Sequence, residues 1–175
     1  MNVRFARMQA EKLAEHVGKS RIPVDVGAIA KSLGLEVLYA DLGEDVSGLL
    51  IFNGESAQVC VQNGDPPVRQ RFTIAHEIGH HFLRHQFETG EHVHVDKGNY
   101  ISQRGPRASE GVDPKEVQAN QFAASLLMPT KAVQQRISKL ARGGPILDTH
   151  VESLAKAFEV SEQAMTIRLT GLGLL

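Results

Sequence analysis

Apolar and polar residues alternate along the chain with periods that distinguish helices from strands. Phe5, Met8 and Leu13 recur at roughly helical spacing near the N-terminus, which predicts an amphipathic helix there. Two short apolar runs are joined by a turn that contains Asn53-Gly54, and this dipeptide strongly favours a β-hairpin. For the first half of the chain, the patterns predict helices over residues 3–16 and 24–33 and strands over residues 35–42, 47–52 and 58–61.

Capping signals set the boundaries of the helices in the second half. Asp65 followed by Pro66 predicts a helix start, with the aspartate as N-cap and the proline as the first helical residue. Asp113 followed by Pro114 repeats this signal, and Thr130 is expected to cap the next helix. The predicted helices run from residue 66 to about 83, from 114 to 128, from 130 to about 141, and as two short helices within 148–175 hinged at 159–161. The polar residues 86–112 between them are predicted to form a long loop.

These elements predict an α+β fold in which a small antiparallel or mixed sheet is combined with several helices. At 175 residues the chain has the size of one domain, or of one domain with a small appendage. We expect a core over residues 1–143, and a small helical segment, similar to a helix-turn-helix, over residues 144–175 packed on that core.

Composition places the chain among soluble globular proteins, with 42% hydrophobic and 22% charged residues. Its net charge of -1 lacks the basic excess that is typical of nucleic-acid binding. The single cysteine, Cys60, excludes an internal disulfide and is expected to be a small buried apolar residue. The N-terminal segment has no signal-peptide core, and no apolar run approaches the roughly 20 residues needed to span a bilayer. We therefore expect a cytoplasmic protein that does not bind a membrane.

The sequence His76-Glu77-Ile78-Gly79-His80 lies within the helix predicted for residues 66–83. Residues four apart share one face of a helix, so His76 and His80 can place two imidazole nitrogens on one metal ion. Glu77 is the expected general base, because a metal lowers the pKa of its bound water and a nearby carboxylate accepts the proton. A chain of this composition should contain the pattern by chance only roughly 0.03 times. The alternative, a solvated helix face, conflicts with the apolar residues around the motif.

A catalytic zinc site needs a third protein ligand from another element. Glu116 is a good candidate, because it lies one turn into the next predicted helix and Asn120, one turn further on, can hydrogen-bond a ligating histidine. Spacing alone does not decide this assignment, since Asp113 and Glu116 also fit a capping box. The other candidates are His81, His85, His92, His94 and Glu110. Of these, His81 is expected to point away from the metal, and the histidines at 92 and 94 are expected to be exposed.

Two strings, RQRFTIAHEIGHHFL and EVQANQFAASLLMP, together resemble the ImmA/IrrE family of metallo-endopeptidases. The earlier segments VDVGAIAKSLGLEV and VSGLLIF and the C-terminal segment VESLAKAFEVSEQAMTIRLTGLGL are similar to this family as well. The resemblance extends from about Val24 to Leu174. It implies a zincin-like fold with one bound metal ion, which would be zinc, with manganese as the alternative.

The resemblance also implies a role for each residue of the motifs. His76, His80 and Glu116 would bind the metal, Glu77 would be the catalytic base, and Asn120 would hydrogen-bond to His76. At the position of Asn120, related proteins carry either Asp or Asn.

Members of the family typically cleave a helix-turn-helix repressor and thereby switch on stress-response or mobile-element genes, so the resemblance implies a protein substrate of this kind. Zincins usually hold the substrate as an added strand, for which the hairpin of residues 47–62 is the expected sheet edge. The apolar residues of the tail, 148–175, are expected to help in docking the substrate. Tyr100, and less specifically Arg104 and Arg107, are candidates for stabilising a developing oxyanion from the predicted loop.

Two other functions compete with peptide hydrolysis. Residues 151–169 are similar to a helix-turn-helix, which suggests a DNA-binding regulator, but the second helix offers only Arg168 as a basic residue. A metal-binding regulatory module without turnover would also account for the histidines. The presence of Glu77 argues against this last alternative, because a binding module has no need for the base.

Overall fold

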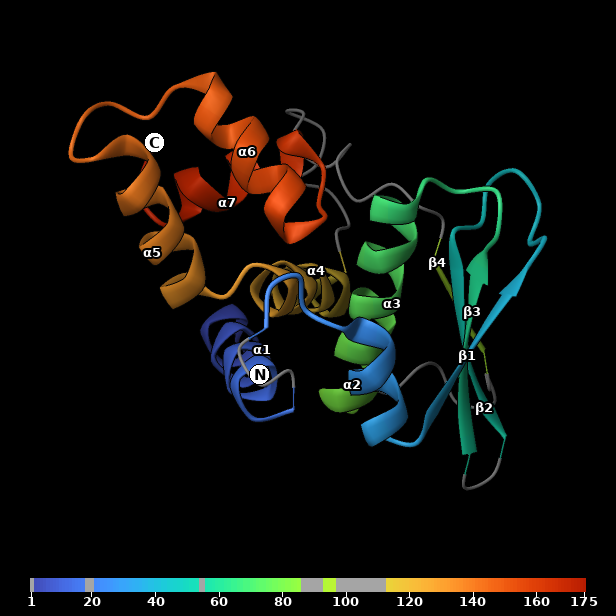
Figure 1. Cartoon of the computed structure of the whole chain (residues 1–175). Coiled ribbons are helices and arrows are strands. Elements are labelled where there is room, and N and C mark those ends of the chain that lie inside the picture. Colours follow the sequence, from blue (N-terminus) through green and yellow to red (C-terminus); the bar gives the residue numbers. More distant parts are fainter. Residues whose placement is uncertain (1, 18–20, 54–55, 86–92, 97–112) are drawn as a thin grey trace.

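A computed structural model describes residues 2–17, 21–53, 56–85, 93–96 and 113–175 (Figure 1). A sheet forms one side of the molecule, helix α3 lies against it, and the remaining helices lie on the other side of α3 or beside it (Figure 1). The helices are α1 (Val3–His16), α2 (Val26–Ser32), α3 (Pro67–Phe82), α4 (Pro114–Leu127), α5 (Thr130–Ala141), α6 (Asp148–Phe158) and α7 (Glu162–Gly171). The strands are β1 (Leu35–Ala40), β2 (Gly48–Asn53), β3 (Ser56–Gln62) and β4 (Val93–Asp96).

The sheet is mixed and has the strand order β1-β3-β2-β4. β1 runs parallel to β3, whereas β2 is antiparallel to both β3 and β4. Ala57, Val59 and Val61 alternate along β3 and are buried in the core, as expected for a sheet with one covered face. The predicted α+β class and the hairpin of β2 and β3 are confirmed.

Strand β4 is a correction to the prediction of a continuous loop over residues 86–112. Four residues are too few to produce a recognisable alternation, and the strand forms because β2 offers it an edge, with Gly48 paired to Asp96. β2 is therefore paired on both sides, so the hairpin is not the open edge that was expected. Residues 86–92 and 97–112 of the predicted loop lie outside the described part of the chain.

Three predicted helix starts differ from the structure because side chains take other partners. α2 begins at Val26 and not at residue 24, since Asp25 accepts a hydrogen bond from the Ala28 amide and acts as N-cap. Asp65 is not the N-cap of α3; Pro66 occupies that position, and the Asp65 carboxylate pairs with Arg69 Nε at 3.2 Å. Thr130, the predicted cap of α5, is instead its first residue. Its hydroxyl donates to the Glu11 carboxylate of α1.

The C-terminal helices α6 and α7 contribute to the same hydrophobic core as the rest of the chain. Leu154, Phe158, Met165 and Leu169 are fully buried. The expectation that the tail's apolar residues serve as a docking surface is therefore wrong for these four, because they are already covered. Glu159, with φ 52°, turns the chain between the two helices at the predicted hinge.

Cys60 is only half-buried, contrary to the prediction, because its neighbours in β3 occupy the core face of the strand. Burial and the nearby Glu36 raise the pKa of its thiol.

None of the helices in the described part of the chain combines the length and apolar character that crossing a membrane requires.

Candidate metal centre

Helix α3 is buried on all sides from its middle to His80. Eight consecutive residues, from Thr73 to His80, are buried between the sheet and α4. Two glycines permit this close packing. A Cβ on Gly48 of β2 would lie 2.4 Å from Thr73 Cγ2, and a Cβ on Gly79 would lie 3.3 Å from both Cα and O of Ala119 in α4. The motif helix is thus fixed against both a strand and a second helix.

His76 and His80 face one another on α3. Both side chains are fully buried, their ring centroids are 4.7 Å apart, and their Nε2 atoms are separated by 3.0 Å. This is the arrangement that the spacing of four residues predicted. The Nε2 atoms of the two imidazoles therefore point to the same position in the core.

Glu116 of α4 approaches the same point. Its Oε2 lies 3.3 Å from His76 Nε2 and its Oε1 lies 3.2 Å from His80 Nε2. The start of α4 is capped by the Asp113 side chain, which accepts a hydrogen bond of 2.8 Å from the Lys115 amide. Asp113 thus caps the helix, while the Glu116 carboxylate is directed at the histidines. The Glu116 side chain is still partly exposed, at 27%.

The three donors fit a tetrahedral metal ion. Ligand atoms at 2.0–2.1 Å from zinc in a tetrahedron are separated by about 3.3 Å. The separations of the Nε2 atoms from each other and from the carboxylate oxygens are 3.0, 3.2 and 3.3 Å. Among the described residues, His76, His80 and Glu116 form the group of His, Cys, Asp and Glu side chains that is close enough to share an ion. Two imidazoles and one carboxylate also form a ligand set found in catalytic zinc sites.

Each histidine is held from its other ring nitrogen. His76 Nδ1 lies 3.0 Å from Asn120 Oδ1, the partner that the resemblance implied. Because an amide oxygen only accepts, His76 carries its proton on Nδ1 and presents the Nε2 lone pair to the cluster. His80 Nδ1 lies 3.1 Å from His85 Nδ1.

Neither His81 nor His85, two of the other candidates for the third ligand, belongs to the cluster. His81 points away from it, as expected, and stacks near Phe52 with ring centroids 6.2 Å apart. His85 meets the far side of the His80 ring in an edge-on contact of 4.9 Å. Burial lowers the pKa of His85, against the smaller opposing effect of a hydrogen bond with Gln118, and burial also lowers the pKa of His81.

Glu77 is fully buried beside the first histidine. Its Oε1 would lie 3.5 Å from a Cβ on Gly48, so the carboxylate reaches the start of β2. The base predicted from the sequence is thus enclosed between the motif helix and the sheet.

Comparison with known sequences agrees with this geometry. The sequence model of a family described as the IrrE N-terminal-like domain matches residues 30–170, which include both helices of the cluster. The chain belongs to the ImmA/IrrE family of metallopeptidases. The radiation response metalloprotease IrrE of Deinococcus radiodurans is 29% identical to it over 119 residues, which make up 68% of this chain and 32% of that protein. The chain therefore spans about a third of the length of this ImmA/IrrE relative.

Several candidates from the predicted loop lie outside the described residues of this ImmA/IrrE chain. They are Tyr100, Arg104, Arg107, His92 and Glu110. His94 belongs to β4, of which only the backbone is described. The oxyanion-stabilising role of Tyr100 remains a prediction.

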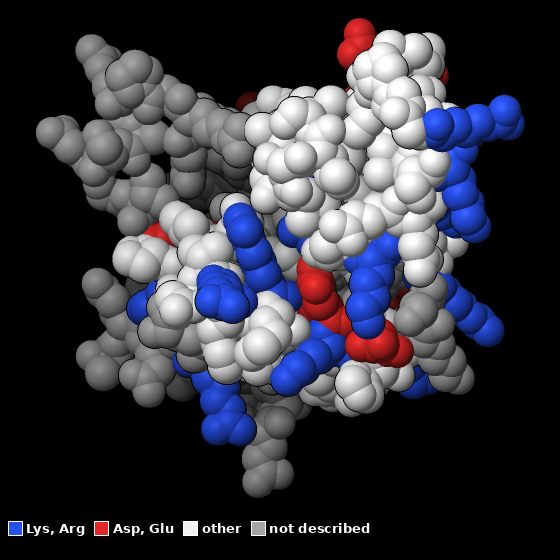
Figure 2. Space-filling view, turned by 90° about the vertical axis from the view of Figure 1, so that its left-hand side faces the viewer, with Lys and Arg blue, Asp and Glu red and all other residues white. Residues whose placement is uncertain are grey.

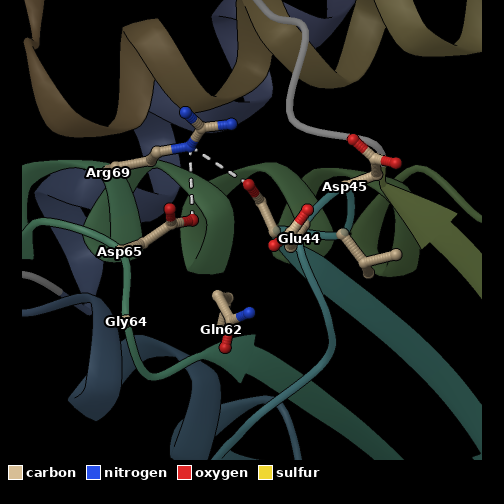
Figure 3. Close-up of a pocket in the computed structure, with 8 residues that line it drawn as sticks. Glu44, Asp45, Gln62, Gly64, Asp65 and Arg69 are labelled. Atoms are coloured by element: carbon tan, nitrogen blue, oxygen red, sulfur yellow. Dashed lines mark hydrogen bonds and ion pairs between the residues drawn. The ribbon is translucent and has the colours of Figure 1, made fainter.

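A separate acidic hollow of about 490 Å³ lies at the N-terminal end of α3 (Figure 3). Glu44, Asp45 and Asp65 line it, together with Ser47 and Arg69. Arg69 Nε lies 3.2 Å from the Asp65 carboxylate and donates to Ser47 Oγ at 3.1 Å. The Arg69 guanidinium thus engages two oxygens of the hollow, one from the Asp65 carboxylate and one from the Ser47 hydroxyl. The residues that line the hollow are distinct from those of the metal cluster.

The position of Arg168 argues against the DNA-binding interpretation of the tail. This side chain is only 6% exposed, and it donates to the Met128 carbonyl at 3.0 Å and to the Glu11 carboxylate at 3.0 Å. It is buried too deeply to contact DNA phosphates.

Figure 2 shows Lys and Arg side chains spread over the face on the left of Figure 1, with acidic side chains between some of them. Lys131 Nζ of α5 lies 3.8 Å from the Glu15 carboxylate of α1.

Proposed function

We propose that the chain is a zinc-dependent endopeptidase, with His76, His80 and Glu116 as ligands and Glu77 as general base. The observation that carries this proposal is the spacing of the three donor groups, 3.0–3.3 Å, in a buried cluster. Membership of a metallopeptidase family supports the reaction class. Zinc is favoured over manganese because imidazole donors at tetrahedral spacing suit zinc, whereas manganese prefers oxygen donors in an octahedron.

The chain's own residues would carry the proton through the reaction. Bound zinc would supply Lewis acidity to the scissile carbonyl and to the attacking water. Glu77 accepts the proton of that water and then delivers it to the nitrogen of the leaving amine, as the C–N bond breaks. Asn120 acts through His76, because its amide oxygen fixes the tautomer whose Nε2 binds the metal.

We infer that the substrate lies extended along β4 and not along the β2–β3 hairpin. β4 is the last strand of the described sheet, so its outer side is the position at which a further strand would add. The register also favours this side: Asp96 of β4 is paired with Gly48, and Gly48 adjoins the Glu77 carboxylate. A chain that adds to β4 near Asp96 would therefore pass close to the base.

We propose a helix-turn-helix repressor as the substrate and the cytoplasm as the location, since such repressors act there. The name of the Deinococcus radiodurans relative, a radiation response metalloprotease, supports a link to stress. A protein partner is preferred to nucleic acid because the basic residue of α7 is buried.

The experiment that tests the metal centre is elemental analysis of the purified chain. We expect about one zinc per chain, either as purified or after addition of zinc. His80→Ala should abolish tight binding, because it removes one of three ligands. His81→Ala is the matched control, since that neighbouring histidine faces away from the cluster. A folded sample without a tight divalent site would reject the proposal.

A further inference from the structure

The two histidines of the cluster are supported by different elements. Asn120 reaches His76 from α4, whereas His85 reaches His80 from the turn that directly follows α3. A histidine that binds a metal through Nε2 must carry its proton on Nδ1 and can donate it. The group that receives this proton fixes the ring orientation and makes the ligand more basic.

The local backbone explains why His85 lies in this position. α3 ends in a Schellman turn, in which the Arg84 amide donates to the His81 carbonyl and the His85 amide donates to the His80 carbonyl, both at 3.1 Å. Arg84 adopts φ 52°, a left-handed conformation that normally favours glycine. The turn folds the chain back over the last turn of the helix. His85 consequently contacts His80 twice. Its backbone amide donates to the His80 carbonyl, and its ring nitrogen lies next to the His80 ring.

We propose that His85 is a positioning residue that accepts a hydrogen bond from His80 Nδ1 and thereby orients the metal ligand. Its Nδ1 is 3.1 Å from that donor, and its ring meets His80 edge-on. In this arrangement the His85 proton is on Nε2 and its ring is neutral. This inference rests on the metal centre proposed above.

Two substitutions at residue 85 separate the acceptor from the packing of the ring. His85→Phe keeps an aromatic ring but has no acceptor, whereas His85→Asn places an amide oxygen near the position of Nδ1. His81→Phe is the matched control, because His81 is also a half-buried histidine at the end of α3 but stacks on the opposite side near Phe52.

The readouts are zinc affinity, measured by competition with a chromophoric chelator, and the visible absorption of bound cobalt(II), which reports the ligand geometry. We expect His85→Phe to lower zinc affinity by about 10–100-fold and to alter the cobalt spectrum. His85→Asn and His81→Phe should retain the affinity and the spectrum of the parent chain. Thermal unfolding of the metal-free proteins checks that all the variants fold.

Two results would overturn the inference. The first is that His85→Phe binds zinc as tightly as the parent chain, which would mean that the acceptor has no effect on the ligand. The second is that His85→Asn loses as much zinc affinity as His85→Phe, which would mean that His85 acts through packing alone. In both cases the parent chain still binds zinc, so the proposed function survives. A parent chain without a tight metal site would instead reject the proposed function and this inference together.

Discussion

Gly79 of α3 lies against Ala119 of α4 so closely that a Cβ at position 79 would come within 3.3 Å of the Ala119 backbone. This contact controls how near α4 approaches the motif helix. Because Glu116 is carried by α4 and His80 follows Gly79, the same contact determines whether the carboxylate reaches the histidines.

We therefore expect Gly79→Val to separate α3 from α4. The larger side chain would also meet Phe122, whose Cδ1 lies 3.2 Å from the Cβ position, and overpacking of this kind costs about 1–3 kcal/mol of stability. Zinc affinity should fall as well, because Glu116 moves away. Chemical denaturation and chelator competition measure the two effects.

Gly27→Val in α2 is the control for the Gly79 experiment. It is also a glycine within a helix, but the nearest atom to its Cβ position is Asp25 Oδ1 at an ordinary distance of 3.5 Å. The free energy of unfolding of Gly27→Val should differ from that of the parent chain by less than about 1 kcal/mol, because only helix propensity changes. Equal effects of the two substitutions would contradict the packing argument.

Glu77→Gln should retain zinc and lose hydrolysis. The amide has nearly the shape of the carboxylate in its buried site but cannot accept the proton of the attacking water, so the rate should fall by about 10²–10⁴-fold. Zinc content and the rate of peptide cleavage are measured on the same preparation. Loss of zinc in this variant would mean that Glu77 is a ligand and not the base.

Glu116→Gln should have the opposite pattern and weaken zinc binding first. Removing a group that supports a ligand already costs 10–100-fold in affinity, so loss of a carboxylate ligand should cost at least about 100-fold. Glu162→Gln is a suitable control, because Glu162 is also an acidic residue in the first turn of a helix, α7. If the two variants lost stability equally and kept zinc, Glu116 would act only through the helix start.

The sequence predicted the parts of the site that depend on local geometry. His76, Glu77 and His80 share one helix, and the spacing of four residues fixes how the two imidazoles face each other. The position of Glu116 could not be decided in this way, since a residue three after the N-cap suits both a capping box and a ligand. The packing of α4 on α3 decides between them, and that packing depends on residues distant in sequence.

Other differences have the same physical origin. Thr130 was expected to cap a helix, but Glu11, more than a hundred residues away in sequence, binds its hydroxyl. Arg168 is predicted only as the single basic residue of the last helix, and its burial depends on the Met128 carbonyl and the Glu11 carboxylate, which satisfy it in the core. A short strand such as β4 forms only because β2 provides its partner. No local pattern encodes these long-range contacts.

We expect the zinc-loaded chain to cut a helix-turn-helix repressor, encoded beside its own gene, at a single site in an exposed linker. Only a segment that can become extended can add to β4, where the register brings Gly48 and Glu77 to the same end of the strand. Unfolded casein, which offers many extended segments but no folded partner surface, should be cut slowly or not at all.

Incubation of both proteins with the parent chain, followed by mass spectrometry of the products, measures this difference in selectivity. Glu77→Gln provides the control for contaminating proteases, because it should keep the metal site and leave the repressor intact. A single fragment pair from the repressor, absent with the variant, is the expected result. Rapid digestion of casein with an intact repressor would leave a general peptidase in place of a regulatory one, since a site that selects only for extended backbone discriminates poorly between sequences.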